Sequence, residues 1–249
     1  MLMNLLEPSA GQASVLGGDC RTLTGDGFRR IGYVAEDQEQ PDWMTVGQLL
    51  DYCRPFYPTW DAALATEMIT RFALPLDHKL KHLSRGMGMK AVLTSSLAYR
   101  PELIVLDEPF GALDPLVRDE FVESLIERAP ETTILISSHD LAEIETFATH
   151  IGFMEQGRLI FAEELESLAA RVREVEVTFA GSAPELAPDW PQTWLNPQLS
   201  GPVLRFVDTR FIAQDVAACF PAAHRIDARP LTLRDMFLAL AKANRAAKS

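Results

Sequence analysis

Two adjacent carboxylates follow a short apolar run in the middle of the chain. Residues 103–106 are Leu-Ile-Val-Leu, and Asp107 and Glu108 come directly after them. Such an unbroken apolar run predicts a strand that is buried on both faces of a parallel sheet. Because ligands of open α/β sheets bind at the carboxyl ends of the strands, Asp107 can hold a divalent metal there and Glu108 can polarise a water molecule. The alternative is an acidic turn in solvent, since short matches of this kind are common.

A histidine follows a second apolar strand, which is predicted at residues 132–137. His139 lies beyond Glu108 in the chain, with one predicted helix between the two residues. Parallel strands joined by a helix end at the same edge of a sheet, so His139 and Glu108 are expected on that edge. A histidine there can hydrogen-bond a phosphate and help to position a water molecule. A structural histidine at a strand end is the alternative.

A Ser-Arg-Gly sequence begins a predicted helix at residues 83–99. Ser84 can cap this helix, and Gly86 and Gly88 allow main-chain N–H groups to approach a ligand. Because a helix N-terminus carries bare N–H groups and a partial positive charge, it favours an anion. The alternative is an ordinary serine N-cap, which this motif alone slightly favours over a phosphate site.

Strands and helices alternate along the first two thirds of the chain. Strands are predicted at 14–17, 28–34, 103–107 and 132–137, and helices at 46–54, 61–72, 83–99, 115–128 and 140–148. This order predicts an α/β fold built on a mostly parallel sheet with right-handed connections.

The last third of the chain is expected to form a small α+β appendage. A hairpin is predicted at residues 151–161 and a domain boundary after residue 170. Beyond it we expect strands at 172–179 and 203–207, a proline-rich loop at 184–202, and helices at 212–220 and 232–243. The chain is therefore expected to hold a domain at 1–170, with a helical part at about 40–100, and an accessory region at 171–249.

Composition narrows the classes of function. The chain has 249 residues and a formal net charge of −12, which argues against a broad basic face for nucleic acid. Its three cysteines lie far apart, so the sequence indicates a reducing compartment and no cysteine metal site. No apolar run approaches the roughly 18 residues needed to span a membrane.

The order of these motifs resembles that of a known family. LSRGM, LIVLDEP, GALD and SSHD follow one another at residues 83–140, as in the ATP-binding subunits of ABC transporters. The resemblance covers residues 1–161, and residues 229–237 also resemble the closing strand and helix of that family. It implies a P-loop NTPase-like fold, the cofactors ATP and Mg²⁺, and a place on the cytoplasmic face of a membrane.

The resemblance also implies roles for individual residues. Asp107 would hold Mg²⁺ through water, Glu108 would be the general base for the attacking water, and His139 would contact the γ-phosphate. Asp114 would lie in a loop that crosses to a second ATP-binding subunit in a head-to-tail dimer. The signature residues would face the ATP held by that second subunit: Ser84, Arg85, Gly86, Met87 and Gly88.

The resemblance also implies that an aromatic stretch at residues 40–60 binds a membrane-spanning subunit. This stretch follows Glu36, which occupies the expected Q-loop position. Trp43, Tyr57 and Trp60 are the expected docking residues, and Phe56 lies among them. Large aromatic side chains gathered on a surface segment are typical of binding hot spots. Alternatively, each of these side chains packs inside a small helical subdomain.

The sequence departs from the family pattern at three places. Arg85 and Met87 stand where Gly and Gln are commonest, and Glu36 rather than Gln occupies the Q-loop position, with Gln38 nearby. No Gly in the chain is followed by Lys, so the phosphate loop G-x-x-x-x-G-K-[ST] is absent. Residues 1–6 would match the end of the helix that follows this loop.

We therefore expect an ABC-type ATPase domain that is incomplete at its N-terminus and that alone binds and hydrolyses ATP poorly. Two alternatives remain: a non-catalytic ABC subunit that lends its signature face to a partner, and a soluble ABC-type ATPase that acts outside transport. The acidic charge counts against an enzyme that acts on ribosomes or DNA.

Overall fold

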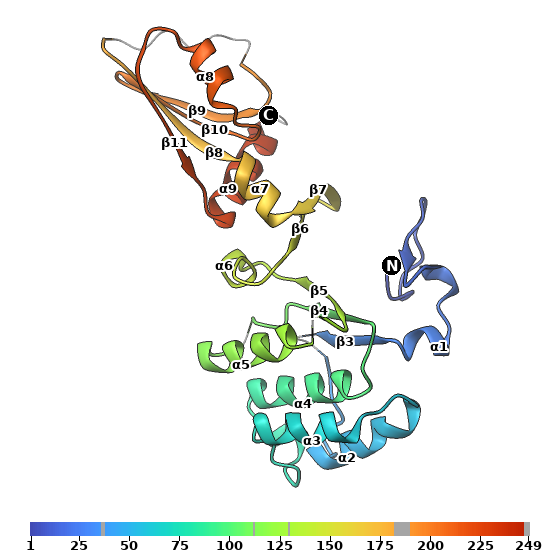
Figure 1. The fold of residues 1–249 in the computed structure, drawn as a ribbon. Helices are drawn as coiled ribbons and strands as arrows, with labels where there is room; N and C mark the ends of the chain where they lie inside the picture. The colour runs from blue at the N-terminus through green and yellow to red at the C-terminus, as the bar shows by residue number, and fades with distance from the viewer. Residues whose placement is uncertain (36–37, 112, 129, 182–189, 247–249) are drawn as a thin grey trace. The chain divides into compact units, whose positions relative to one another are not determined.

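The computed structural model describes every residue except 36–37, 112, 129, 182–189 and 247–249 (Figure 1). The chain divides into two compact units, Met1–His139 and Asp140–Ser249. The candidate catalytic residues all belong to the first unit.

A three-stranded parallel sheet forms the centre of the first unit. Its strands are β3 (Ile31–Ala35), β4 (Leu103–Asp107) and β5 (Thr133–Ser137), in the order β3-β4-β5. Asp107 is in register with Ala35 on one side and with Ser137 on the other. The three strands therefore end together, and the expected α/β class is confirmed.

The longer helices of this unit are α2 (Val46–Cys53), α3 (Ala62–Arg71), α4 (Arg85–Leu97) and α5 (Pro115–Ile126). Figure 1 shows α4 between the sheet and the pair α2 and α3, and α4 contacts β3, α2 and α3. Ala91, Leu93 and Leu97 of α4 are buried at 0–2% exposure. The polar first turn of α4 is thus held at the edge of a rigid apolar layer.

The N-terminal segment packs on the partly buried side of β4. It contains β1 (Ser14–Val15), β2 (Gly18–Asp19) and α1 (Gly25–Phe28). Val15 and Cys20 are buried here, with Leu103 and Val105 packed against them. Residues 1–6 form turns and bends rather than the expected helix end, and Asn4 has a left-handed φ of 50°, which interrupts a right-handed helix.

The two apolar strands are less buried than their sequences predict. Ile104 and Leu106 of β4 are fully buried, but Leu103 and Val105 on the other side are only partly covered. β5 was expected to be buried on both faces, and this is wrong, since Leu135 is 43% exposed. The physical reason is that β5 lies at the edge of the sheet, where it pairs within the described residues with β4 alone.

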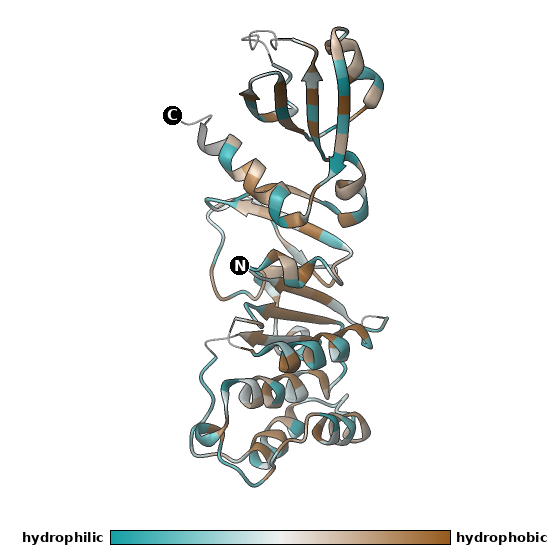
Figure 2. Cartoon of the chain, turned by 90° about the vertical axis from the view of Figure 1, so that its left-hand side faces the viewer, coloured by the Kyte–Doolittle hydropathy of each residue, from teal (hydrophilic) through white to brown (hydrophobic). Residues whose placement is uncertain are grey.

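The second unit is built on a four-stranded antiparallel sheet in the order β11-β8-β10-β9. Figure 2 shows apolar and polar residues alternating along its strands. Its elements are α6 (Leu141–Ile144), β6 (His150–Glu155), β7 (Arg158–Glu164), α7 (Leu165–Arg171), β8 (Arg173–Phe179), β9 (Trp194–Ser200), β10 (Val203–Asp208), α8 (Ala213–Cys219), β11 (Ala223–Pro230) and α9 (Leu233–Ala246).

The strand β9 corrects the loop that was predicted at residues 184–202. Pro197 made a strand unexpected, because proline cannot donate to a ladder of hydrogen bonds. β9 lies at the edge of the sheet, where a missing N–H is tolerated. Residues 182–189 of that prediction lie outside the described residues.

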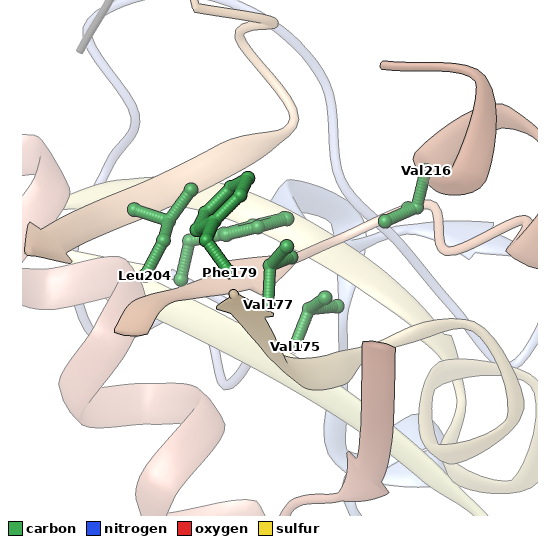
Figure 3. Packing of buried hydrophobic residues seen from close by; sticks show 6 residues of the cluster. Val175, Val177, Phe179, Leu204 and Val216 are labelled. Atoms are coloured by element: carbon green, nitrogen blue, oxygen red, sulfur yellow. The ribbon is translucent and has the colours of Figure 1, made fainter. Parts of the chain in front are cut away.

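Helix α8 covers one face of this sheet. Val175, Val177 and Phe179 of β8 lie on the same side of their strand, and Val216 of α8 belongs to the same buried cluster (Figure 3). A second cluster joins Leu168 and Val172 to Leu233 and Met236 of α9.

Residues before the predicted domain boundary belong to this second cluster. Leu141, Ile151 and Phe161 pack against it, and the compact unit that holds this cluster begins at Asp140. The domain limits 1–170 and 171–249 remain a prediction.

Candidate functional site

Polar groups of β4 and β5 meet where the two strands end. The Ser137 hydroxyl donates to Asp107 Oδ1 at 2.5 Å. The Glu108 N–H lies 3.1 Å from the Ser137 carbonyl oxygen and 3.2 Å from its Oγ. Ser137 therefore fixes the Asp107 carboxylate and the main chain of Glu108 together.

Glu108 has a left-handed main chain, with φ at 49°. This conformation is uncommon for a residue with a side chain and costs on the order of 1–3 kcal/mol. It places Glu108 Oε2 2.7 Å from His139 Nδ1 and 3.4 Å from the His139 main-chain nitrogen. The side chains of Glu108 and His139 are 36% and 79% exposed, so water reaches the pair. A carboxylate and an imidazole in contact can accept and hold a proton taken from a bound water.

The oxygen donors at this edge suit a magnesium ion. Asp107 is exposed, and its carboxylate lies beside the Ser137 hydroxyl. Mg²⁺ is usually held by one or two carboxylates together with waters and substrate phosphates. The described residues contain no cluster of three or more His, Cys, Asp or Glu that forms a complete metal cage. The donor set therefore fits a metal that arrives with a phosphate ligand.

The signature residues lie in the first turn of α4. Ser84 is the N-cap, and its Oγ accepts a hydrogen bond from the Met87 N–H at 3.2 Å. Ser84 and Arg85 are exposed, whereas Gly86 faces α5, and a Cβ at Gly86 would lie 3.2 Å from Val117 Cγ1. Gly86 thus allows close helix packing, and a Cβ at Gly88 would meet no atom within 4 Å. The structure shows the capping role of Ser84, and the phosphate role of the signature stays a prediction.

Asp114 is the N-cap of α5. Its Oδ1 accepts from the Val117 N–H at 3.1 Å, and the residue is exposed. The contact of Asp114 with a second subunit stays a prediction. Glu36, the predicted Q-loop residue, lies outside the described residues.

The expected docking aromatics differ in exposure. Trp43 is 65% exposed and available to a partner. Tyr57 is half-buried and stacks on Tyr99 with ring centroids 3.7 Å apart, and Trp60 is also half-buried. The Tyr99 hydroxyl donates to the Ile31 carbonyl oxygen at 2.9 Å, so Tyr57 supports the attachment of the helices to β3.

Sequence reasoning missed Tyr52 as a surface aromatic. Tyr52 and Phe56 are 56% and 51% exposed, with ring centroids 5.4 Å apart. Their spacing of four residues, which places side chains on the same face of a helix, was the available signal. Ser137 was also missed, although a polar residue at the end of an apolar strand marks the same edge as Asp107.

Ion pairs connect the helices around the site. The buried Lys90 of α4 pairs with Glu120 of α5 and lies 5.3 Å from the Phe72 ring centroid. At the start of α3, hydrogen bonds from the Leu64 N–H and from Arg100 lower the pKa of Asp61 below its ordinary value. These contacts fix α3, α4 and α5 relative to one another.

Comparisons with known proteins identify relatives of this chain. Residues 1–111 match the family model described as "ABC transporter". The chain is 34% identical over 153 residues to the ABC transporter ATP-binding protein YtrB of Bacillus subtilis, and the match covers 61% of this chain and 52% of that protein. It is 28% identical over 208 residues to the probable multidrug ABC transporter ATP-binding protein YbhF of Escherichia coli, with 79% and 35% covered.

A solved structure of an ATP-binding subunit of an ABC transporter aligns with a TM-score of 0.61 and 25% identity, covering 68% of this chain and 73% of the other. The chain spans about half or less of the length of the curated relatives named above. No helix in the described part of the chain is long and apolar enough to cross a membrane.

Proposed function

We propose that this chain is the ATP-binding subunit of an ABC membrane transporter, because residues 1–111 match the family model described as "ABC transporter" and the relatives named above are ATP-binding proteins. The observation that carries the proposal is the contact between Glu108 and His139 beside Asp107 at the carboxyl edge of the sheet. This is where an α/β sheet of this kind binds its ligand.

In this proposal Glu108 is the general base of ATP hydrolysis. Its carboxylate accepts the proton of the attacking water, and His139 holds that carboxylate in place and contacts the γ-phosphate. Asp107, oriented by Ser137, holds Mg²⁺ through water. When bound, the metal neutralises charge on the phosphates during transfer.

A second ATP-binding subunit completes the site in this proposal. The exposed first turn of α4, with Ser84 and Arg85, faces the phosphates of the ATP that this second subunit holds. A helix N-terminus with an adjacent arginine favours an anion electrostatically. Asp114 lies in the segment that crosses between the two subunits.

A membrane-spanning subunit is the third partner in the proposal. Trp43, Tyr52 and Phe56 are large, exposed aromatic residues of the helical part and form the proposed docking surface. Tyr57 and Trp60, half-buried, act by supporting that surface rather than by direct contact. The chain then works as a peripheral protein on the cytoplasmic face of a membrane.

The 249-residue chain alone is proposed to bind MgATP weakly. In P-loop proteins a ring of N–H groups and one lysine hold the β- and γ-phosphates. The sequence contains no Gly-Lys pair, and the carboxylates of Asp107 and Glu108 repel a nucleotide that lacks its metal. The same observation supports a second candidate function, in which the chain lends its signature face to a partner and hydrolyses nothing itself.

The experiment compares the 249-residue chain with a chain to which the strand and phosphate loop of a relative are joined ahead of Met1. Calorimetry measures MgATP binding, and phosphate release measures turnover. We expect weak binding by the first chain and binding with turnover by the second. A joined chain that folds and binds MgATP without turnover would support the non-catalytic function. Tight MgATP binding by the 249-residue chain would contradict the proposal.

A further inference from the structure

A cavity that is unrelated to the proposed nucleotide site lies in the C-terminal unit. Its volume is about 330 Å³, and its lining residues all belong to the unit Asp140–Ser249. The walls come from β7, α7, β9, β10 and α9. The apolar lining residues are Phe161, Leu168, Val172, Leu195, Val207, Met236 and Leu240.

Two arginines and a threonine form the polar part of the lining. Arg171 is bound to both carboxylate oxygens of Glu163 and also donates to the Thr209 carbonyl oxygen, so its charge is neutralised. The Thr209 hydroxyl donates to the Thr193 carbonyl oxygen at 3.1 Å. These two residues give the polar side of the cavity a fixed structure.

Arg210 differs from Arg171. Its main-chain N–H donates to Asp208 Oδ1 at 2.9 Å, but its guanidinium makes no ion pair with any residue that the structure describes. The other oxygen of the buried Asp208 accepts from Trp194 Nε1 at 3.1 Å. The carboxylates of Glu163 and Asp208 are therefore engaged already, and the exposed guanidinium of Arg210 remains for a ligand.

We propose that this cavity binds a small amphiphilic anion, a straight-chain carboxylate of medium length. The apolar walls remove its hydrocarbon chain from water, and the planar guanidinium of Arg210 matches a carboxylate with two parallel hydrogen bonds. No Asp or Glu is found among the described residues that line the cavity, so no lining carboxylate repels the anion. A volume of about 330 Å³ lies at the small end of ligand pockets, which excludes large lipids.

The binding test uses the full chain and the probes hexanoate, octanoate and decanoate below the concentrations at which they form micelles. Calorimetry should give saturable binding, with affinity that increases about threefold to fourfold per added methylene. The ¹³C-methyl signal of Met236, assigned with Met236→Leu, should shift on titration. Decylamine, with the same chain and a cationic head, should bind at least tenfold more weakly. Equal binding of decylamine, or an unchanged Met236 signal, would overturn the proposal.

Substitutions distinguish the contribution of the Arg210 charge to ligand binding from the contribution of the apolar walls. Arg210→Gln should weaken decanoate binding about tenfold or more, because a hydrogen bond to a charged group is lost. Arg225→Gln is the matched control, since Arg225 lies on β11, which lines no part of the cavity, and it should bind decanoate normally. Leu240→Trp should fill the cavity and abolish binding, and circular dichroism reports whether that variant is folded. Equal losses in Arg210→Gln and Arg225→Gln would contradict the inference.

Discussion

Glu108 Oε2 and His139 Nδ1 lie 2.7 Å apart, although 31 positions separate the two residues in the chain. The contact exists because β4 and β5 are adjacent, parallel and in register, and because Glu108 adopts a left-handed main chain at the exit of β4. The Glu108 carboxylate is therefore oriented before any ligand arrives. This supports the assignment of the proton-accepting role to Glu108.

Replacing this base should separate ATP binding from ATP hydrolysis. In the chain joined to a phosphate loop, Glu108→Gln should lower turnover by about 10²–10⁴-fold, because the amide keeps the shape but cannot accept a proton. The dissociation constant for MgATP should change little. Glu166→Gln, at an exposed position of α7, is the matched control and should keep full turnover. Normal turnover in Glu108→Gln would remove this residue from the mechanism.

From the proposed docking surface we expect that two substitutions weaken membrane association and leave the stability of the chain unchanged. Trp43→Ala combined with Phe56→Ala should reduce co-purification with the membrane-spanning subunit, because both side chains are more than half exposed and available to a partner. Thermal unfolding should be unchanged. If the double variant still co-purifies with that subunit, the docking surface lies elsewhere.

Substitution of Tyr57, unlike the double substitution, should lower the stability of the chain. Because its ring stacks on Tyr99, Tyr57→Ala should lower the free energy of unfolding by about 1–3 kcal/mol, measured in urea. A Tyr57→Ala variant as stable as the original chain would show that the stack contributes little.

Low pH should reduce the stability that Asp61 contributes at the start of α3. The pKa of Asp61 lies below its ordinary value of 3.8 in the folded chain, so the folded state binds fewer protons than the unfolded state at this site. Its stabilising contribution is present above about pH 4 and is lost as pH falls through the lowered pKa. The urea midpoints of the original chain and of Asp61→Asn should therefore converge below that pH. If the two midpoints stay equally far apart at low pH, Asp61 does not stabilise the helix start in this way.

The edge strand β5 should promote association between chains. Its five residues carry no charge, Leu135 is 43% exposed, and unprotected apolar edges are templates for pairing. Leu135→Lys should reduce concentration-dependent light scattering. Leu116→Lys is the control, because Leu116 is 69% exposed but lies on helix α5. Equal effects of the two changes would show that exposure alone, and not the strand edge, drives association.

The sequence by itself determined the local elements and the motifs they carry. Short stretches of residues are enough to recognise several of these features. They are the apolar runs of β4 and β5, the serine cap of α4 and the proline at the start of α5. Periodicity and capping depend on neighbours within a few positions, so they can be read without a fold. The family resemblance depends on the same short motifs in order.

The tertiary structure alone decided which side chains meet and which are covered. The strand register joined Ser137 to Asp107, stacking on Tyr99 left Tyr57 half-buried, and the edge position of β9 allowed a proline within a strand. The cavity at Arg210 likewise requires five elements to assemble. Each of these outcomes depends on contacts between residues far apart in the chain, and packing in three dimensions, rather than local propensity, determines such contacts.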